Sequence, residues 1–387
     1  MSAGPQATAS PGVLDGVRVV EFSQLIAAPF CGLTLVDLGA QAIKVEPPGG
    51  DAMRQFPPYL PDGRPAQFCA LNRGKRSVVA DLTTAQGRDL AAGLIARADV
   101  VLENLGDARE LLGLTYADAA AERPPLVWCA ITGWGAASAG RSIDPSLQAA
   151  MGLISITGEE AGGPVRIPVP LVDFMTGMYA AQSILAALWQ VRLGGPGSFL
   201  DCAMVDAATT LVSTSALLAG GGYFAPRRLG SESPLVVPSG VFNASDGNQV
   251  QIVCVTERHW RGLCQAVGHP QWLNEPDCRD NAARLANREL VRSRLQAVIA
   301  SATADSWVRR ISEHGAICEH VRDIEDAWAD RRLVERGLLA ELQLGPEGTT
   351  RMPLMSLARH WRGEAAALAP VPALGADTEA VAQELRG

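Results

Sequence analysis

Residues 16–46 contain an apolar segment, a helical segment and a second apolar segment in close succession, and this order restricts the fold more than any other feature. Residues 16–22 (GVRVVEF) and 41–46 (QAIKVE) have the apolar content of buried strands. The intervening residues 29–40 predict a helix, with Pro29 in its first turn and Gly39 at its end. Strands joined by a helix pair in parallel, so we predict an α/β protein with a doubly wound parallel sheet.

The alternation of strand and helix patterns continues to about residue 220. The predicted strands are 76–82, 99–105, 125–135 and a short one within 193–204, and the predicted helices are 84–98, the segment after Asp173, and 205–222. This layout predicts one large domain, preceded by a disordered tail at residues 1–13 (MSAGPQATASPGV).

The amino-acid composition and the pattern of predicted elements change after residue 220. Residues 220–240 are rich in Gly, Pro and Ser, which indicates a linker or an active-site loop. The segment 241–256 predicts a β-hairpin with its turn at Asp246-Gly247, and charged helical segments follow to about residue 342. We therefore expect a smaller α+β domain here, and a final helix that starts near Asp377 or Thr378.

Charge and hydropathy exclude several classes of protein. The formal net charge of −8 and the pI near 5.3 argue against nucleic-acid binding, which needs a basic face. The first residues lack the basic and apolar regions of a secretory signal, and we expect no run of about 18 uncharged apolar residues that could span a membrane.

Cysteine and histidine placement narrows the chemistry further. The eight cysteines are scattered without a CxxC pair, so we expect no metal site, no disulfide framework and a cytoplasmic location. All five histidines lie beyond residue 258, so a Ser-His or Cys-His pair cannot form within the first two-thirds of the chain. The turn after the first strand, SQLIAAP, lacks the glycines of a dinucleotide site, so we expect no NAD even though Glu46 ends a strand as a ribose-binding acid would.

Asp173 is the one acid in a long apolar stretch, RIPVPLVDFMTGMYAAQSILAALWQV. Its position before a helical pattern predicts that it is the N-cap of that helix. A fixed carboxylate is also a positioned nucleophile, so the two interpretations are compatible. Burial would raise its pKa from about 3.9 and a helix N-terminus would lower it, and even a rise of about 2 units leaves it mostly ionised at pH 7.

Eight segments along the chain stand out: LDGVRVVEFSQLIAAPF, LGAQAIKVEPPGGDAMR, LNRGKRSVVADL, DVVLEN, DPSLQAAMGLISITG, VDFMTGMYAAQSILAAL, PSGVFNASDG and PALGADTEAV. In this order they resemble the family III CoA-transferases, the group of formyl-CoA transferase and carnitine CoA-transferase. They span roughly residues 14 to 385, so the resemblance covers almost the whole chain.

The resemblance implies an interlocked homodimer. Each subunit would have a Rossmann-like large domain, built from residues 14–222 and the returning segment 331–387, and a small α+β domain at 223–330 with flanking linkers. It also implies that the chain takes coenzyme A as acyl-CoA, with no metal and no NAD.

The resemblance further assigns roles to individual residues. Asp173, four residues before Gly177, would be the catalytic carboxylate. The residues implied for CoA binding are Ile26, Ala27, Asn72, Lys75, Arg76, Ala80 and Asn104, with Arg109 as a weaker candidate. Arg73, Lys75 and Arg76 form a cationic cluster in the sequence that suits the CoA phosphates. Backbone N–H groups near Gly135 or the glycines at 220–222 are candidates for stabilising oxyanions.

The implied reaction moves CoA from an acyl-CoA to a free carboxylic acid through aspartyl anhydride and aspartyl-CoA thioester intermediates. Segments 105–112 and 135–144 are shorter than the family pattern, so donor and acceptor cannot be carried over. Two alternatives remain open: an acyl-CoA racemase or epimerase of the same superfamily, which would need a histidine that GWGAASAGRSID lacks, and a CoA-binding protein without catalysis.

Overall fold

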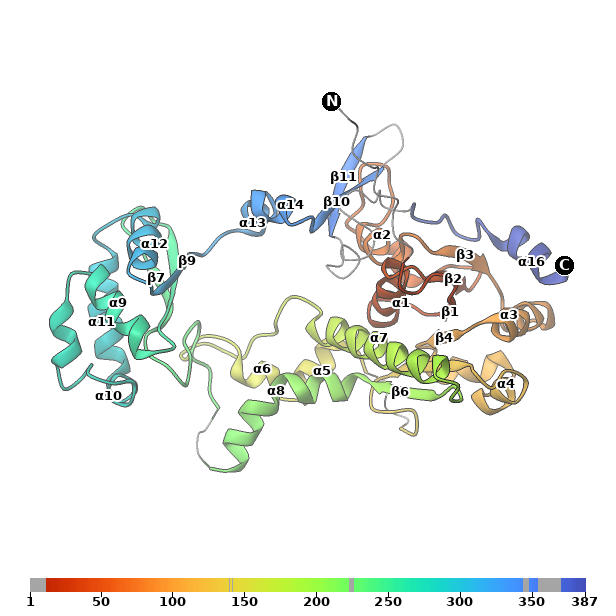
Figure 1. Ribbon diagram of the computed structural model, residues 1–387, viewed down its shortest axis with the longest axis horizontal. Helices are drawn as coiled ribbons and strands as arrows, with labels where there is room; N and C mark the ends of the chain where they lie inside the picture. Colours follow the sequence, from red (N-terminus) through yellow and green to blue (C-terminus); the bar gives the residue numbers. More distant parts are fainter. Residues whose placement is uncertain (1–11, 139, 141, 223–225, 344–347, 354–369) are drawn as a thin grey trace. The chain divides into compact units, whose positions relative to one another are not determined.

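The computed structural model describes residues 12–138, 140, 142–222, 226–343, 348–353 and 370–387 (Figure 1). The chain forms two compact units: Met1–Met151, Ile167–Ser213 and Arg331–Gly387 make the first, and Gly152–Arg166 and Thr214–Asp330 make the second. Relative to the domain bounds expected from the sequence, the segments 152–166 and 214–222 group with the second unit. Most of the expected tail, residues 1–11, lies outside the described part of the chain.

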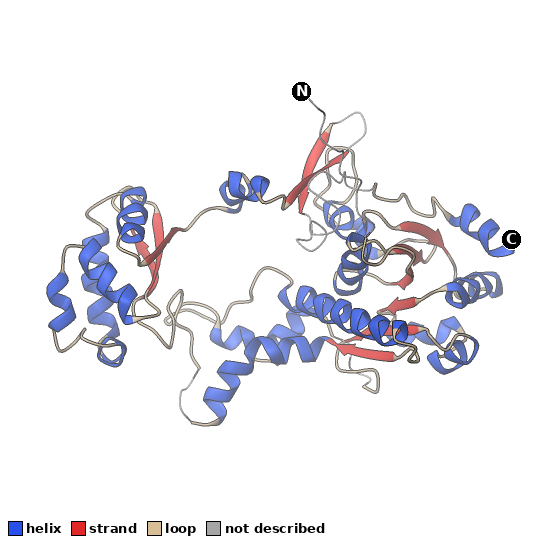
Figure 2. Cartoon of the chain, in the orientation of Figure 1, coloured by secondary structure: helices blue, strands red, loops and turns tan. Residues whose placement is uncertain are grey.

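The first unit is built on a six-stranded sheet in which every pair of neighbouring strands is parallel. Its strands are β1 (Arg18–Phe22), β2 (Gln41–Glu46), β3 (Arg76–Val79), β4 (Val100–Glu103), β5 (Val127–Thr132) and β6 (Phe199–Ala203). The strand order β3-β2-β1-β4-β5-β6 confirms the predicted doubly wound α/β fold, since the sheet grows in one direction from β1 to β3 and in the other from β4 to β6. Figure 2 shows the strands in red and the helices in blue.

Helices and short 3₁₀ segments connect these strands. They are α1 (Ala27–Asp37), η1 (Ala52–Gln55), α2 (Ala66–Asn72), α3 (Ala85–Arg97), η2 (Gly106–Leu112), α4 (Tyr116–Glu122), α5 (Asp144–Ala150), α7 (Leu171–Arg192) and the first part of α8 (Met204–Gly220). Phe22 and Trp128 of the sheet share one apolar core with Leu94 of α3 and with Val381 near the C-terminus. Helix α7 packs along α1 and also contacts β5 and β6.

Helix α7 corrects one expectation. By length and composition alone it is apolar enough to cross a membrane, although the sequence led us to expect no such segment. In the structure it packs on α1, β5 and β6, and Val172, Ala180 and Ile184 are buried. A core helix of an α/β sheet passes the same test of composition, so this is weak evidence for a membrane span.

The C-terminal segment returns to the edge strand β3. Helix α16 (Thr378–Arg386) begins directly after Asp377, as the sequence predicts. The Ser77 N–H donates to the Asp377 carboxylate (2.9 Å), and the Val79 N–H donates to the Thr378 hydroxyl (3.0 Å). Arg76 also binds Glu384 of this helix (2.8 Å). These contacts attach α16 to a strand some 300 residues earlier in the chain.

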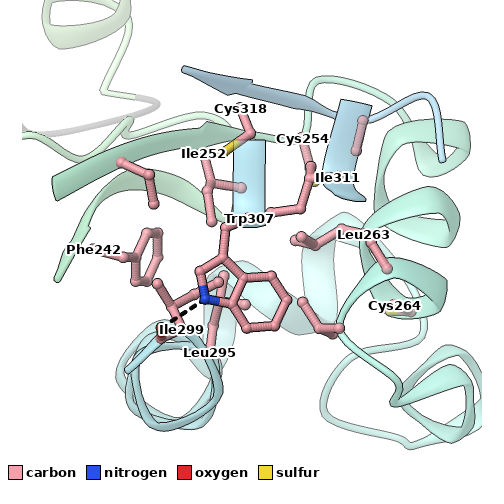
Figure 3. Packing of buried hydrophobic residues seen from close by; sticks show 14 of the residues in the cluster. Phe242, Ile252, Cys254, Leu263, Cys264, Leu295, Ile299, Trp307, Ile311 and Cys318 are labelled. Atoms are coloured by element: carbon pink, nitrogen blue, oxygen red, sulfur yellow. Dashed lines mark hydrogen bonds between the residues drawn. The ribbon is translucent and has the colours of Figure 1, made fainter. Parts of the chain in front are cut away.

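The second unit has its own core around a three-stranded antiparallel sheet of β7 (Ser239–Asn243), β8 (Gln249–Val253) and β9 (Ile317–His320). The hairpin predicted at Asp246-Gly247 is confirmed, since β7 pairs with β8 and Gly247 has a φ of +81°. The indole N–H of the buried Trp307 donates to the Ile299 carbonyl at 2.7 Å, in the centre of this core (Figure 3).

The helices of the second unit are α6 (Leu153–Ile156), α9 (Glu257–Ala266), η3 (Pro270–Asn274), α10 (Asn281–Ala286), α11 (Arg288–Ile299), α12 (Ala304–Glu313) and α13 (Ile324–Trp328). In the first unit, α14 (Arg331–Glu335) leads to an antiparallel pair, β10 (Leu339–Gln343) and β11 (Thr349–Pro353). The expected helical stretch from 257 to 342 is therefore interrupted by strands β9 and β10.

We expect Asp377→Ala to loosen the return of the C-terminal segment. The substitution leaves the Ser77 N–H without its acceptor and removes one partner of Arg76, so the free energy of unfolding should fall by about 1–2 kcal/mol. Urea denaturation measures this change. Glu379→Ala is the matched control, because Glu379 lies in the same helix and its one hydrogen bond runs to exposed Gln383. Equal effects of the two substitutions would show that the Asp377 contacts do not anchor the segment.

Candidate active site

Asp173 lies in the first turn of α7, and it is not the N-cap that the sequence predicted. The helix begins two residues earlier at Leu171, Pro170 is the N-cap, and no side chain of the cap residue makes the capping hydrogen bond. The Asp173 carboxylate is therefore free of the capping role that the sequence suggested. It is partly buried in the described part of the chain.

The capping is done by Asp144, which begins α5 and which sequence reasoning did not select. Its buried carboxylate accepts the N–H of Val172 (2.7 Å) and that of Asp173 (3.4 Å). The Gln148 amide donates to its other oxygen at 2.7 Å. The one sequence signal was an Asp-Pro pair at the start of a helical pattern, and the helix that it caps lies 28 residues away.

The surroundings of Asp173 disfavour its ionised form. Burial raises its pKa to about 7, and the neighbouring Asp144 carboxylate adds to this rise. The rise from the ordinary value of about 3.9 exceeds the rise of about 2 units considered for the sequence, so the carboxyl group of Asp173 ionises near neutral pH. A carboxylate that is dehydrated and yet ionises near neutral pH is suited to act as a nucleophile.

Gly177 sets the distance between α7 and α1. A Cβ at this position would lie 2.7 Å from the Ala27 carbonyl oxygen and 2.9 Å from the Phe30 ring, so only glycine allows this approach. The Phe30 and Phe174 rings meet edge to face with centroids 4.9 Å apart. The start of α7, with Asp173, is thereby brought beside the start of α1.

The turn between β1 and α1 lies at the carboxyl end of the sheet, at the reversal of strand order. Asn104, directly after β4, accepts the Gln24 N–H (2.9 Å) and donates to the Gln24 carbonyl (2.8 Å). Ile26 and Ala27 follow in the same turn, with Ala27 the first residue of α1. Three of the residues implied for CoA binding, Ile26, Ala27 and Asn104, therefore meet at the edge where ligands of such sheets bind.

The predicted cationic cluster at Arg73, Lys75 and Arg76 is not a cluster in space. The Lys75 ammonium is fully buried and donates to Glu21 (2.9 Å) and to Asn72 (3.0 Å), and burial lowers its pKa to about 8. Arg73 is buried in a bidentate pair with Asp37. Arg76 points to the C-terminal helix. In this structure these cations balance acids of the same chain and are not presented together to a phosphate.

Ala80 and Arg109 complete the predicted residues. Ala80 is buried just after β3, and its N–H donates to the Glu46 carbonyl (2.9 Å). The Arg109 side chain is 27% exposed and its Nε donates to Glu103 at 2.5 Å. Its two terminal nitrogens bond to none of the described residues, so they can bind an anion. Burial raises the pKa of Glu103, and Arg109 opposes that rise.

The candidate oxyanion donors are already engaged. The Gly135 N–H donates to the Thr132 hydroxyl (3.1 Å). Gly220 ends α8, and the N–H groups of Gly221 and Gly222 donate to carbonyls of that helix end. In the structure, residues 220–222 therefore form the end of helix α8 and its following turn.

The comparisons with known proteins agree with this architecture. The family model described as CoA-transferase family III matches residues 14–378. Succinate–glutarate CoA-transferase of Agrobacterium fabrum is 33% identical over 96% of this chain and 95% of its own. Succinyl-CoA:mesaconate CoA-transferase of Haloarcula marismortui is 32% identical over 86% of both chains.

Solved structures agree as well. A CAIB/BAIF family protein from Brucella suis shares 31% identity, covers 97% of this chain and 100% of its own, and superposes with a TM-score of 0.81. Rv3272 from Mycobacterium tuberculosis shares 29% identity over 96% and 99% of the two chains, with a TM-score of 0.83. With the parallel sheet and the family model in agreement over nearly the whole length, the chain belongs to CoA-transferase family III and is an enzyme of that class.

Proposed function

We propose that this enzyme moves CoA from an acyl-CoA donor to a free carboxylic acid, with Asp173 as the nucleophile. The observation that carries the proposal is the Asp173 carboxylate itself, held at the start of α7 with a pKa raised to about 7. Its helix packs against α1, which follows the turn at the sheet's carboxyl edge, where a nucleotide-bearing substrate would bind. The sequence contains no histidine before residue 259, so the racemase alternative lacks its expected base in this region.

The proposed steps balance without metal or ATP. The Asp173 carboxylate attacks the thioester carbonyl, the C–S bond breaks, and a mixed anhydride and CoA thiolate form. The thiolate then attacks the aspartyl carbonyl, which gives an aspartyl-CoA thioester and releases the donor acid. The acceptor carboxylate attacks this thioester to form a new anhydride and thiolate. Attack of the thiolate on the acceptor's acyl carbon gives the product and restores Asp173.

The substrates follow from the relatives. The relatives from A. fabrum and H. marismortui are named succinate–glutarate CoA-transferase and succinyl-CoA:mesaconate CoA-transferase. We therefore propose succinyl-CoA as donor and a dicarboxylic acid as acceptor. Mass spectrometry of the products from a panel of acyl-CoAs and free acids identifies the pair, and transfer restricted to monocarboxylic acids would contradict the dicarboxylate assignment.

For CoA binding we propose the turn at Ile26-Ala27 together with Asn104 and Arg109. The support is their place at the strand reversal and the unengaged terminal nitrogens of Arg109. The Lys75 and Arg76 side chains are held in internal ion pairs. We therefore propose that this segment contacts CoA only through backbone groups, at Asn72, Lys75, Arg76 and Ala80.

Hydroxylamine should inactivate the enzyme only when a donor acyl-CoA is present, because Asp173 becomes electrophilic only after acylation. Peptide mass spectrometry should find the hydroxamate in residues 167–192. Asp173→Asn should fold, bind CoA and show no transfer above background. Substantial transfer by Asp173→Asn, or labelling of another acid, would assign the chemistry elsewhere.

The pH dependence of the transfer rate should follow the ionisation of Asp173. The anion is the reactive form, so a group with a pKa of about 7 gives a rate that falls as the pH drops below 7, about tenfold per unit. Asp144→Asn removes a negative charge beside Asp173 while keeping an oxygen acceptor for the Val172 N–H. The pH below which the rate falls should therefore be lower in this variant. Asp280→Asn, at the helix cap of α10, is the matched control and should leave that pH unchanged. If the pH dependence of the rate were the same in Asp144→Asn as in the unsubstituted enzyme, the Asp144 charge would have no effect on the pKa of Asp173.

We also propose a homodimer located in the cytoplasm. Large apolar side chains lie exposed on the described surface of the first unit, with Trp189 61% and Leu193 71% exposed at the end of α7. A second copy would cover such side chains. The eight unpaired cysteines suit a reducing compartment.

Light scattering during size exclusion should give twice the 40.7 kDa of one chain, and this mass should persist on dilution until the protein unfolds. Trp189→Glu tests the apolar surface and should weaken the assembly, whereas Phe56→Glu, at another exposed apolar residue of the same unit, is the comparison. A folded species with the mass of one chain would contradict the interlocked dimer.

A further inference from the structure

The turn after β1 contains a strained residue. Leu25 has a φ of +64°, and it is the only non-glycine residue with a positive φ among the described residues. A Cβ makes this left-handed backbone unfavourable by roughly 1–2 kcal/mol. Such a conformation persists only where the surrounding structure fixes it, so the groups that fix Leu25 are informative.

Two side chains from separate elements hold the turn. Asp51, just before η1, accepts the Leu25 N–H at 3.2 Å and the Met53 N–H at 2.9 Å on the same oxygen. The Asn104 side chain accepts a hydrogen bond from the N–H of Gln24, the residue before Leu25, and donates one to the Gln24 carbonyl. The turn is therefore attached on one side to the segment after β2 and on the other to the end of β4.

Asp51 is itself fixed by charge. It is fully buried, and its other oxygen lies 2.9 Å from the Lys44 ammonium, which is also fully buried. The Asp51 N–H donates to Glu46 at 3.0 Å. A buried carboxylate with these partners cannot rotate away without leaving the Lys44 ammonium without one of its two acids. The acceptor offered to Leu25 is thus rigid, although Leu25 itself is 37% exposed at the surface.

The place of the turn points to a ligand. It lies at the carboxyl end of β1 where the strand order reverses, and open parallel sheets bind their ligands outside the strand ends at that reversal. The exposed Leu25 side chain buries little apolar surface and so adds little to the stability of the fold. Its unfavourable backbone conformation is therefore better explained by a role in ligand binding.

We infer that Asp51 is a positioning residue, which locks Leu25 in the left-handed conformation and so presents the turn at residues 24–27 preformed to the CoA part of the substrate. The inference rests on the proposed function for the identity of the ligand. A turn that is already in its binding conformation loses no affinity to alternative conformations, because apparent affinity scales with the fraction of competent molecules.

The test separates backbone conformation from side-chain contact at position 25. CoA binding is measured by calorimetry for the unsubstituted chain and for Leu25→Gly, Leu25→Ala and Leu25→Val. If conformation decides, glycine should bind within about threefold of leucine, and valine should bind on the order of fivefold more weakly than leucine, because a β-branched residue tolerates this backbone worst. If apolar contact decides, the order is reversed: valine binds better than alanine, and glycine binds worst. That reversed order, or no effect in any variant, would overturn the inference.

A second pair of variants tests Asp51 directly. Asp51→Ala should raise the KM for acyl-CoA at least about tenfold, the equivalent of one buried hydrogen bond, with kcat within a few-fold. Asp51→Asn keeps an oxygen acceptor for the Leu25 N–H and should retain more affinity than Asp51→Ala. Folding is checked by circular dichroism, and if Asp51→Ala fails to fold, the series at Leu25 decides alone.

The outcomes for the function and for the turn are distinguishable. An unsubstituted chain that does not bind CoA would overturn the proposed function and the ligand named here. Tight CoA binding by the unsubstituted chain and unchanged affinity in folded Asp51→Ala would overturn only the role of Asp51.

Discussion

Four fully buried charged side chains hold the carboxyl edge of the sheet in one arrangement. Glu21 on β1 lies between the ammonium groups of Lys75 (2.8 Å) and Lys44 (3.4 Å), and Lys44 also contacts Asp51 (2.9 Å). Burying charges is costly, and removing one partner leaves another charge unpaired in the interior. The network therefore acts less as a source of net stability than as a constraint, because it ties together β1, β2, the residue before β3 and the residue before η1.

At the start of α7, two neighbouring carboxylates, Asp144 and Asp173, have like charges that do not compensate each other. Asp144 caps the helix and thereby stabilises it, but the burial of Asp173, together with the charge of Asp144, raises the pKa of Asp173 to about 7. A raised pKa means that the folded state holds the proton between about pH 4 and 7 while the unfolded state releases it, so this group's contribution to stability falls as pH rises through that range. The contribution of Asp173 to stability thus declines over the pH range in which the proposed nucleophile ionises.

The sequence predicted the large sheet well, because its strands and helices have strong apolar patterns with Pro and Gly at their limits. It failed where partners lie far apart along the chain. Arg73, Lys75 and Arg76 are neighbours in sequence, yet one binds Asp37, one enters the core network and one binds the C-terminal helix. The prediction of the residue that caps α7 failed for the same reason, since the capping acid belongs to another helix. The left-handed Leu25 had no sequence signal, because glycine or asparagine is the residue that normally marks such a turn.

One glycine connects the two halves of the candidate site. The turn fixed by the charge network leads into α1, and the carboxylate of Asp173 lies on α7, so the proposed chemistry would depend on the spacing of these two helices. Gly177 determines that spacing, because any side chain there would meet the Ala27 carbonyl and the Phe30 ring at less than 3.0 Å. The spacing of four residues between Asp173 and Gly177 then has a physical reason, since residues i and i+4 lie on the same face of a helix. Asp173 lies about one turn before Gly177 on α7, so the position of the proposed nucleophile relative to α1 depends on this close contact.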